Sequence, residues 1–126
     1  MKLVPILAVL SFLVFGAGQA AADDSQRIAN YFVCTLKEGK TPADLIAFKA
    51  SYEKAVEKAG LKGYELRVQF PMYWSGNGEG VFVWDGSWKD FNAMQKIDTW
   101  FSGSEWPAKF QALMTCGESS LWRVVD

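Results

Sequence analysis

A change of hydrophobic period near residue 60 places the strongest constraint on what this chain can fold into. Before it, in TPADLIAFKASYEKAVEKAG (residues 41–60), apolar residues recur every three or four positions, which predicts a helix with one buried stripe. Thr41 and Asp44 form a capping-box pattern at its start, and Gly60 suits its end. After it, residues 64–74 alternate apolar and polar side chains, which predicts a strand with one dry face.

The sequence also predicts strands before this helix and after this strand. RIANYFVCTL (residues 27–36) is rich in β-branched and aromatic residues and predicts a first strand. Asn77-Gly78 within SGNGEG is a strong hairpin-turn signal, so the run from Phe70 to Trp88 is expected to contain a β-hairpin. VFVWD (residues 81–85), apolar on both faces, predicts a central strand.

The last third of the chain predicts a broken helix and a final strand. Asp85-Gly86 is expected to turn the chain, and Ser87 with Asp90 to cap a helix. SGS at residues 102–104 breaks that helix, a second short helix follows, and Gly117 ends it. SLWRVVD (residues 120–126) is then the last strand. The buried side of the helical part is expected to carry Trp88, Phe91, Met94, Ile97, Phe101, Trp106, Phe110, Leu113 and Met114.

The element order is therefore β-α-β-β-α-β, an α+β ferredoxin-like domain. We expect an antiparallel four-stranded sheet with helices on one face and the second helix broken. In this topology the last strand lies beside the first, so the end of one approaches the beginning of the other. Cys34 and Cys116 occupy those two places, and we predict a disulfide between them.

This order of elements over residues 27–126 resembles that of the dimeric α/β-barrel proteins, which include antibiotic-biosynthesis monooxygenase-like domains. The resemblance rests on element order and domain size. It implies a homodimer that pairs two sheets face to face, with a pocket between each sheet and its helices or loops. Reactions in that group include cofactor-free oxygenation and haem chemistry, but the resemblance assigns no catalytic residue to this chain.

The N-terminal segment has the layout of a secretory signal. Lys2 precedes an apolar run that ends in small residues, so residues 1–22 are expected to be a signal peptide and residues 23–126 a single domain. The alternative is an uncleaved membrane anchor, but the apolar run is short for a span. We therefore expect a secreted or periplasmic protein without a stable membrane anchor after cleavage.

Charge and residue types exclude several functions. Without Lys2, 12 basic residues face 14 acidic ones, and this net charge of about −2 makes nucleic acid an unlikely partner. The chain has no histidine, which rules out Ser-His-Asp and Cys-His mechanisms and histidine ligation of metal or haem. With both cysteines in a disulfide, thiolate chemistry is lost as well. We expect neither a metal nor a cofactor.

A ligand site is predicted on the polar face of the second strand. Guanidinium groups suit a carboxylate or another small anion, and aromatic rings at loop mouths often contact ligands. The site is expected to include Arg123 and Tyr31 if they point to the same side as Arg67, and the alternative is an ordinary solvent-exposed sheet face. The candidate residues are Tyr31, Arg67, Gln69, Tyr73, Trp74, Trp84 and Arg123.

Three functions are compatible with these patterns. The first is a secreted domain that binds a small, partly apolar or anionic molecule between aromatics and arginines, as a homodimer. The second is a cofactor-free monooxygenase or isomerase of the same fold, in which Tyr or Arg polarises the substrate. The third is a protein- or glycan-interaction module. A closed pocket favours the first two functions, and a flat aromatic patch favours the third.

Overall fold

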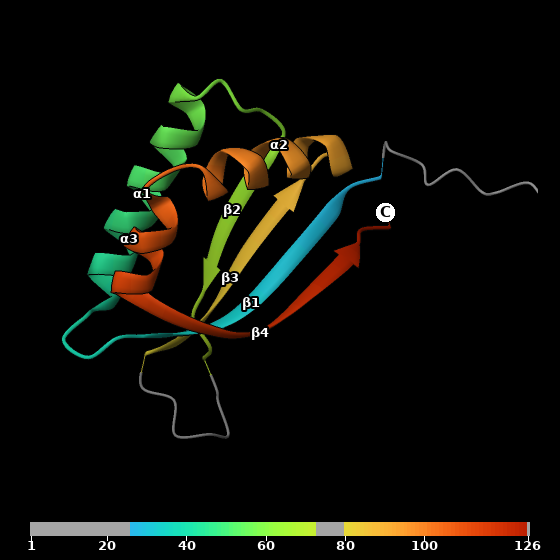
Figure 1. Ribbon diagram of the computed structural model, residues 1–126. Coiled ribbons are helices and arrows are strands. Elements are labelled where there is room, and N and C mark those ends of the chain that lie inside the picture. Colours follow the sequence, from blue (N-terminus) through green and yellow to red (C-terminus); the bar gives the residue numbers. More distant parts are fainter. Residues whose placement is uncertain (1–25, 73–79, 126) are drawn as a thin grey trace, which may run out of the picture.

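The computed structural model describes residues 26–72 and 80–125, which form one sheet and three helices (Figure 1). In chain order the elements are β1 (Ile28–Leu36), α1 (Pro42–Lys58), β2 (Tyr64–Gln69), β3 (Val81–Trp88), α2 (Phe91–Ser102), α3 (Trp106–Leu113) and β4 (Met114–Arg123).

The four strands form one antiparallel sheet in the order β2-β3-β1-β4. All three helices cover the same face of this sheet, and no helix of the described residues covers the other face (Figure 1). The second helical region is divided into α2 and α3 by Gly103–Glu105. The α+β ferredoxin-like arrangement predicted from the element order is therefore confirmed.

Helix α1 begins with the capping box that the sequence indicates. The Thr41 hydroxyl accepts a hydrogen bond from the Asp44 backbone N–H at 3.3 Å, and the Asp44 carboxylate accepts one from the Thr41 N–H at 2.8 Å. These bonds satisfy donors that the first helical turn leaves free. The cap orients α1 so that Leu45, Tyr52 and Val56 face the sheet and are buried.

The layer between the helices and the sheet is mostly aromatic. Phe110 of α3 lies 4.8 Å from Phe48 of α1 and 4.8 Å from Trp84 of β3, measured between ring centroids. Tyr52 lies 5.1 Å from Trp106, and all three pairs meet edge to face, an arrangement that aromatic rings favour. Large rings fix the spacing of the two layers but fill the space between them incompletely.

Strand β3 is longer than predicted, and Asp85-Gly86 does not turn the chain. The Asp85 backbone is aligned with Tyr31 of β1 on one side and with Arg67 of β2 on the other. As a central strand, β3 is held on both edges by hydrogen bonds, and this tertiary pairing overrides the local turn preference. Helix α2 consequently starts after Asp90, whose carboxylate accepts a hydrogen bond from the Ala93 N–H at 2.7 Å, whereas Ser87 was expected at the cap.

Two other boundaries also differ from the prediction. Strand β2 ends at Gln69, and Phe70 and Met72 are exposed instead of lying on its dry face. Strand β4 starts at Met114, directly after α3, so Gly117 lies inside a strand. The predicted hairpin turn at Asn77-Gly78 falls outside the described residues. None of the helices in the described parts of the chain is long and apolar enough to span a membrane.

The predicted disulfide between Cys34 and Cys116 is present. The two cysteines are directly opposite each other on β1 and β4, 82 residues apart in sequence. On β1, Cys34 is almost completely buried. The bond therefore ties the edge strand to the centre of the sheet.

We predict that replacing both Cys34 and Cys116 with Ala lowers the free energy of unfolding by roughly 4 kcal/mol, because an open chain of this length gains conformational entropy when it unfolds. Denaturant titration of the parent and the double variant measures the difference. Ser120→Ala, an exposed change on the same strand, is the control and should alter stability by less than about 0.5 kcal/mol. Equal stability of parent and double variant would contradict the prediction.

Candidate functional site

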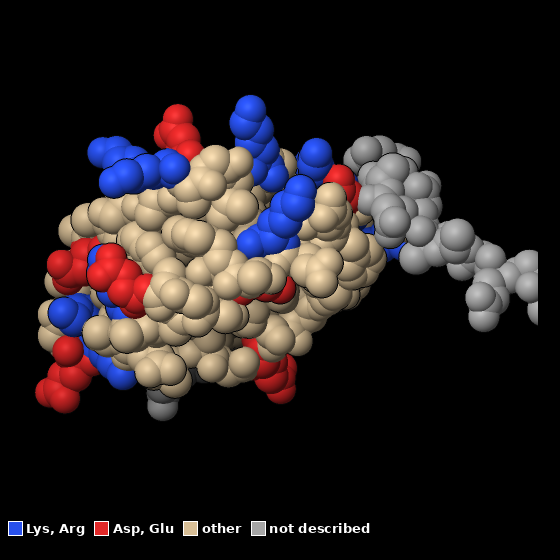
Figure 2. All heavy atoms as spheres, turned by 45° about the horizontal axis from the view of Figure 1, so that its top comes forward, with Lys and Arg blue, Asp and Glu red and all other residues tan. Residues whose placement is uncertain are grey.

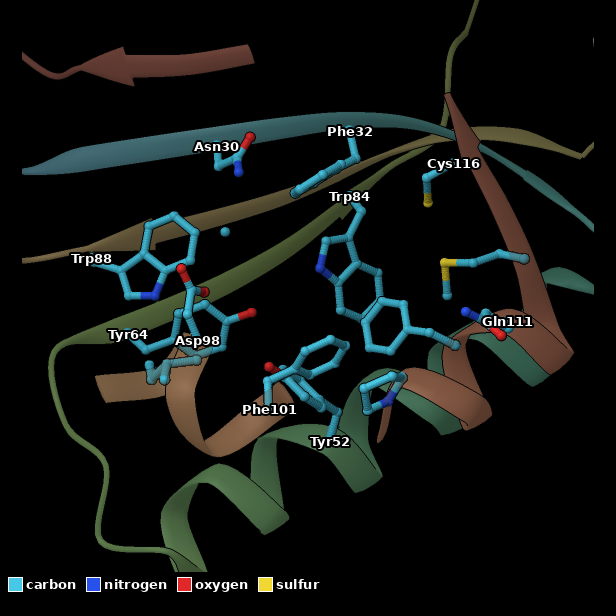
Figure 3. Close-up of a pocket in the computed structure, with 15 residues that line it drawn as sticks. Asn30, Phe32, Tyr52, Tyr64, Trp84, Trp88, Asp98, Phe101, Gln111 and Cys116 are labelled. Carbon is cyan, nitrogen blue, oxygen red and sulfur yellow. The ribbon is translucent and has the colours of Figure 1, made fainter. Parts of the chain in front are cut away.

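A cavity of about 340 Å³ lies between the helix-facing side of the sheet and the helices (Figure 3). Strands β1, β3 and β4 form its floor, and α2 and α3 form most of its cover. Its walls are mainly aromatic. The lining residues are Asn30, Phe32, Tyr52, Tyr64, Trp84, Gly86, Trp88, Ile97, Asp98, Phe101, Pro107, Phe110, Gln111, Met114 and Cys116.

The alternation of β3 explains why this space exists. Trp84, Gly86 and Trp88 are alternate residues of one strand, so all three face the helices. Gly86 has no side chain, and a Cβ placed there would lie 3.2 Å from Trp88 and 3.3 Å from Tyr64. With any other residue at position 86, the two rings would have to move away from the backbone of β3 by a few tenths of an ångström.

Two polar atoms of the cavity wall have no hydrogen-bond partner. Among the described residues, Asn30 Oδ1 and Trp88 Nε1 are the buried side-chain atoms that lack one. Asn30 Oδ1 is an acceptor and Trp88 Nε1 is a donor. Buried polar atoms are nearly always paired, and leaving one unpaired costs about 1–3 kcal/mol. This pair therefore indicates a place where a bound molecule completes the hydrogen bonding.

Two phenols and one carboxylate add titratable groups to the wall. Burial raises the pKa of Tyr52 to about 12 and raises the pKa of Tyr64 still further. Both phenols are therefore neutral near pH 7. Partial burial also raises the pKa of Asp98 above its ordinary value. Figure 3 shows Asp98, Trp88 and Tyr64 among the residues that line the cavity.

Metal ligands do not gather in the described parts of the chain. Within residues 26–72 and 80–125, no group of three or more His, Cys, Asp or Glu side chains could hold a metal ion. In the view of Figure 2, side chains of both charge signs are scattered over a mostly uncharged surface.

Of the ligand-binding residues predicted from the sequence, Trp84 lines the cavity. Arg67, Gln69 and Tyr31 lie on the opposite, helix-free face of the sheet. There Arg67 and Tyr31 flank Asp85 in one row across three strands, and the Gln69 side-chain amide donates to the Asp85 carboxylate at 3.1 Å. Tyr73 and Trp74 lie outside the described residues.

Arg123 does not share that face. It is aligned with Ile28, a buried residue that points toward the helices, so Arg123 belongs to the helix-facing side. The cause is a one-residue shift of register between Phe32 and Cys34, which reverses the side to which the second half of β4 points. Trp122 takes the place beside Tyr31, with ring centroids 6.4 Å apart.

Arg67 is also engaged by a neighbouring carboxylate. It donates to Glu65 at 3.1 Å, and Arg27 donates to the same carboxylate at 2.6 Å. Hydrogen bonding to Arg67 holds the pKa of Glu65 below its ordinary value. Arg67, Gln69 and Tyr31 thus share the helix-free face, apart from the cavity, and Arg67 is paired with Glu65 there. The ligand site on this face stays a prediction.

Sequence reasoning gave no role to Asn30 or Asp98 and assigned Trp88 to a helix. One signal was available for Asn30, because a polar residue interrupts the apolar side of an otherwise hydrophobic strand. Asp98 carried no such signal, since a carboxylate on a helix beside an apolar stripe usually faces solvent.

We predict that Asn30→Leu leaves the free energy of unfolding unchanged or raises it, because the variant removes a buried acceptor that has no partner in the free protein. Chemical denaturation measures this. Phe82→Ala, at a fully buried site on the same side of the sheet, is the contrasting variant and should cost about 3–5 kcal/mol. A loss of several kcal/mol in Asn30→Leu would show that Asn30 is a structural residue.

Comparison with known proteins gives one informative similarity. No family model and no curated protein sequence matches the chain. Among solved structures, the fold is similar to that of SnoaB, a cofactor-independent oxygenase from Streptomyces nogalater, with a TM-score of 0.55 and 17% sequence identity. The similarity covers 80% of this chain and 95% of SnoaB. It confirms the ferredoxin-like fold that the element order predicts.

Proposed function

We propose that the protein is an enzyme, a cofactor-independent oxygenase, and that its substrate binds in the cavity between the sheet and the helices. The observation that carries this proposal is the unpaired donor and acceptor, Trp88 Nε1 and Asn30 Oδ1, in the cavity wall. The structural similarity to SnoaB favours an oxygenase over a binding domain of the same fold.

The cavity fits a small, mainly apolar ring compound that carries oxygen. A volume of about 340 Å³ lies in the range of small-molecule sites. The rings of Trp84, Phe101 and Phe110 offer flat apolar contacts, which suit an aromatic substrate. Trp88 Nε1 can donate to a carbonyl or phenolate oxygen, and Asn30 Oδ1 can accept from a hydroxyl.

Such a substrate can reduce oxygen without help from a prosthetic group. An electron-rich hydroxy-aromatic compound becomes a strong electron donor once it loses a proton. In a monooxygenation of this kind the substrate loses two hydrogens, one oxygen atom enters the product, and the other leaves as water. The protein then has to bind and orient the substrate, exclude bulk water and stabilise the charge that develops on oxygen.

The helix-free face of the sheet is proposed to bind a second copy of the chain. Val33 is 39% exposed there, although it lies in the middle of the central strand β1. The same face carries charges of both signs farther along the sheet, where Arg27 and Arg67 share Glu65. A surface with both signs is self-complementary under two-fold symmetry. A small ligand on this face remains the alternative.

The proposed place of action is outside the cytoplasm. The disulfide suits an oxidising compartment, and the N-terminal residues have the pattern of a secretory signal.

We predict that the purified protein consumes dissolved oxygen when it is given a panel of hydroxylated polycyclic aromatics, without added metal or cofactor. Mass spectrometry with ¹⁸O₂ should find one labelled oxygen atom in the product. Trp88→Phe should lower kcat/KM by about tenfold or more, because it removes one hydrogen bond to a charged oxygen.

Trp122→Phe makes the same change at an exposed position away from the cavity and should leave oxygen uptake unaltered. Tight binding of these compounds without oxygen uptake would make the protein a binding domain. Failure of the whole panel to bind would overturn the proposed substrate class.

We predict that light scattering of the protein at micromolar concentration gives twice the chain mass, and that Val33→Asp gives a monomer, because it buries a charge at the proposed interface. Ile46→Asp, at an exposed position on α1, is the control and should remain dimeric. If the parent protein is a monomer, the helix-free face is open to a small ligand instead. Arg67→Ala should then weaken binding of a small anion.

A further inference from the structure

We propose that Asp98 accepts a proton from the substrate hydroxyl at the rim of the cavity. This inference rests on the proposed function for its substrate class and adds the residue that generates the reactive anion. Among the described residues that line the cavity, Asp98 is the one carboxylate.

The position of Asp98 follows from the packing of α2. Ala93 and Ile97 are the buried residues of this helix, and Ile97 lines the cavity together with Asp98. The neighbouring Asp98 side chain therefore stands at the border between the cavity and solvent. Asp98 lines the same cavity as Trp88 and Tyr64 (Figure 3), so a ligand in this cavity can contact both the carboxylate and the indole.

Within the described residues, no Lys or Arg forms an ion pair with the Asp98 carboxylate. The ion pairs formed there involve other acids: Glu53, Glu65, Asp90 and Glu105. No hydrogen bond to Asp98 is formed within the described residues either. The Asp98 side chain is exposed to solvent at the rim, and desolvation on the cavity side raises its pKa. A titratable group shifted in this way beside a cavity is a candidate functional residue.

The other titratable groups of the cavity wall do not compete with Asp98 for its role. Among the described residues they are the phenols of Tyr52 from α1 and Tyr64 from β2. The negative charge of Asp98 adds to the effect of burial in raising the pKa of Tyr52 to about 12. Both phenols therefore keep their protons near pH 7. Partial burial raises the pKa of Asp98, which makes it a better base than an exposed aspartate.

The proposed step is a single proton transfer. The O–H bond of the substrate breaks, its electron pair stays on the substrate oxygen, and a new O–H bond forms on an Asp98 carboxylate oxygen. The phenolate oxygen then accepts a hydrogen bond from Trp88 Nε1. Dissolved O₂ is the oxidant that takes electrons from this anion, and Asp98 returns its proton to solvent at the exposed rim.

A direct test uses a ligand whose colour reports its own ionisation. We expect 1,2-dihydroxyanthraquinone bound to the parent to ionise at higher pH than when bound to Asp98→Asn, by about one unit or more, because an adjacent negative charge opposes a second one. Glu57→Gln, an exposed change on α1, should leave the titration as in the parent. Circular dichroism verifies folding, and Asp98→Glu, which keeps the charge, should restore most of the shift.

Steady-state kinetics provide a second measurement. With an oxidisable substrate, Asp98→Asn should lower kcat by about a hundredfold or more with little change in KM. It should also abolish the acidic limb of the pH profile, in which activity rises as the carboxyl loses its proton.

The outcomes separate the two proposals. Identical titration of the bound dye in parent and Asp98→Asn overturns the role of Asp98, whether or not oxygen is consumed. A shifted titration without any oxygen uptake supports the proton acceptor and overturns the oxygenase. Failure of the parent to bind the dye overturns both, because the cavity would then not be a site for hydroxylated aromatics.

Discussion

The candidate site depends on the close approach of two aromatic rings to the backbone of β3 at Gly86. Tyr64 and Trp88 belong to adjacent strands and lean toward the same point, with ring centroids 5.6 Å apart. A side chain at residue 86 would meet both rings at little more than 3 Å. Displacing the rings would change the orientation of Trp88 Nε1, so the unpaired donor depends on a residue that has no side chain.

The two faces of the sheet are chemically different because each strand alternates. Toward the helices, β3 presents Trp84 and Trp88 to an apolar cavity. Away from the helices it presents Asp85 and Ser87, which are buried among polar partners that include Gln69 and Arg27. A strand that appears uniformly apolar over VFVWD thus contributes an aromatic wall on one side and part of a charge network on the other.

Much of the fold could be predicted from the sequence, because the deciding signals are local. The capping box at Thr41, the period of α1 and the alternation of residues 64–69 each appear in the structure as predicted. The pairing of Cys34 with Cys116 followed from topology and is confirmed. The extension of β3 through Asp85-Gly86 could not be predicted in the same way, since it depends on strands that flank it on both sides.

The residues of the cavity were harder to predict from the sequence than the fold. Of the predicted ligand-binding residues that the structure describes, Trp84 lines the cavity. Arg67, Gln69 and Tyr31 lie on the other face of the sheet. The polar residues that distinguish the cavity come from three separate elements: Asn30 from β1, Trp88 from β3 and Asp98 from α2. Nothing in their spacing indicates that they meet. The pairing of β1 with β3 brings Asn30 near Trp88, and the packing of α2 over the sheet adds Asp98.

Because of the register shift, the two halves of β4 point different sets of residues toward the helices. From Met114 to Cys116, even-numbered residues face the helices, and Cys116 contributes to the cavity wall. From Ser119 onward, odd-numbered residues do so, because Ser119 is aligned with Phe32. Removing a single residue between these halves would exchange the sides of Trp122 and Arg123 without altering any side chain. In an alignment of related chains, a gap at residues 117–118 would therefore amount to a change of surface chemistry.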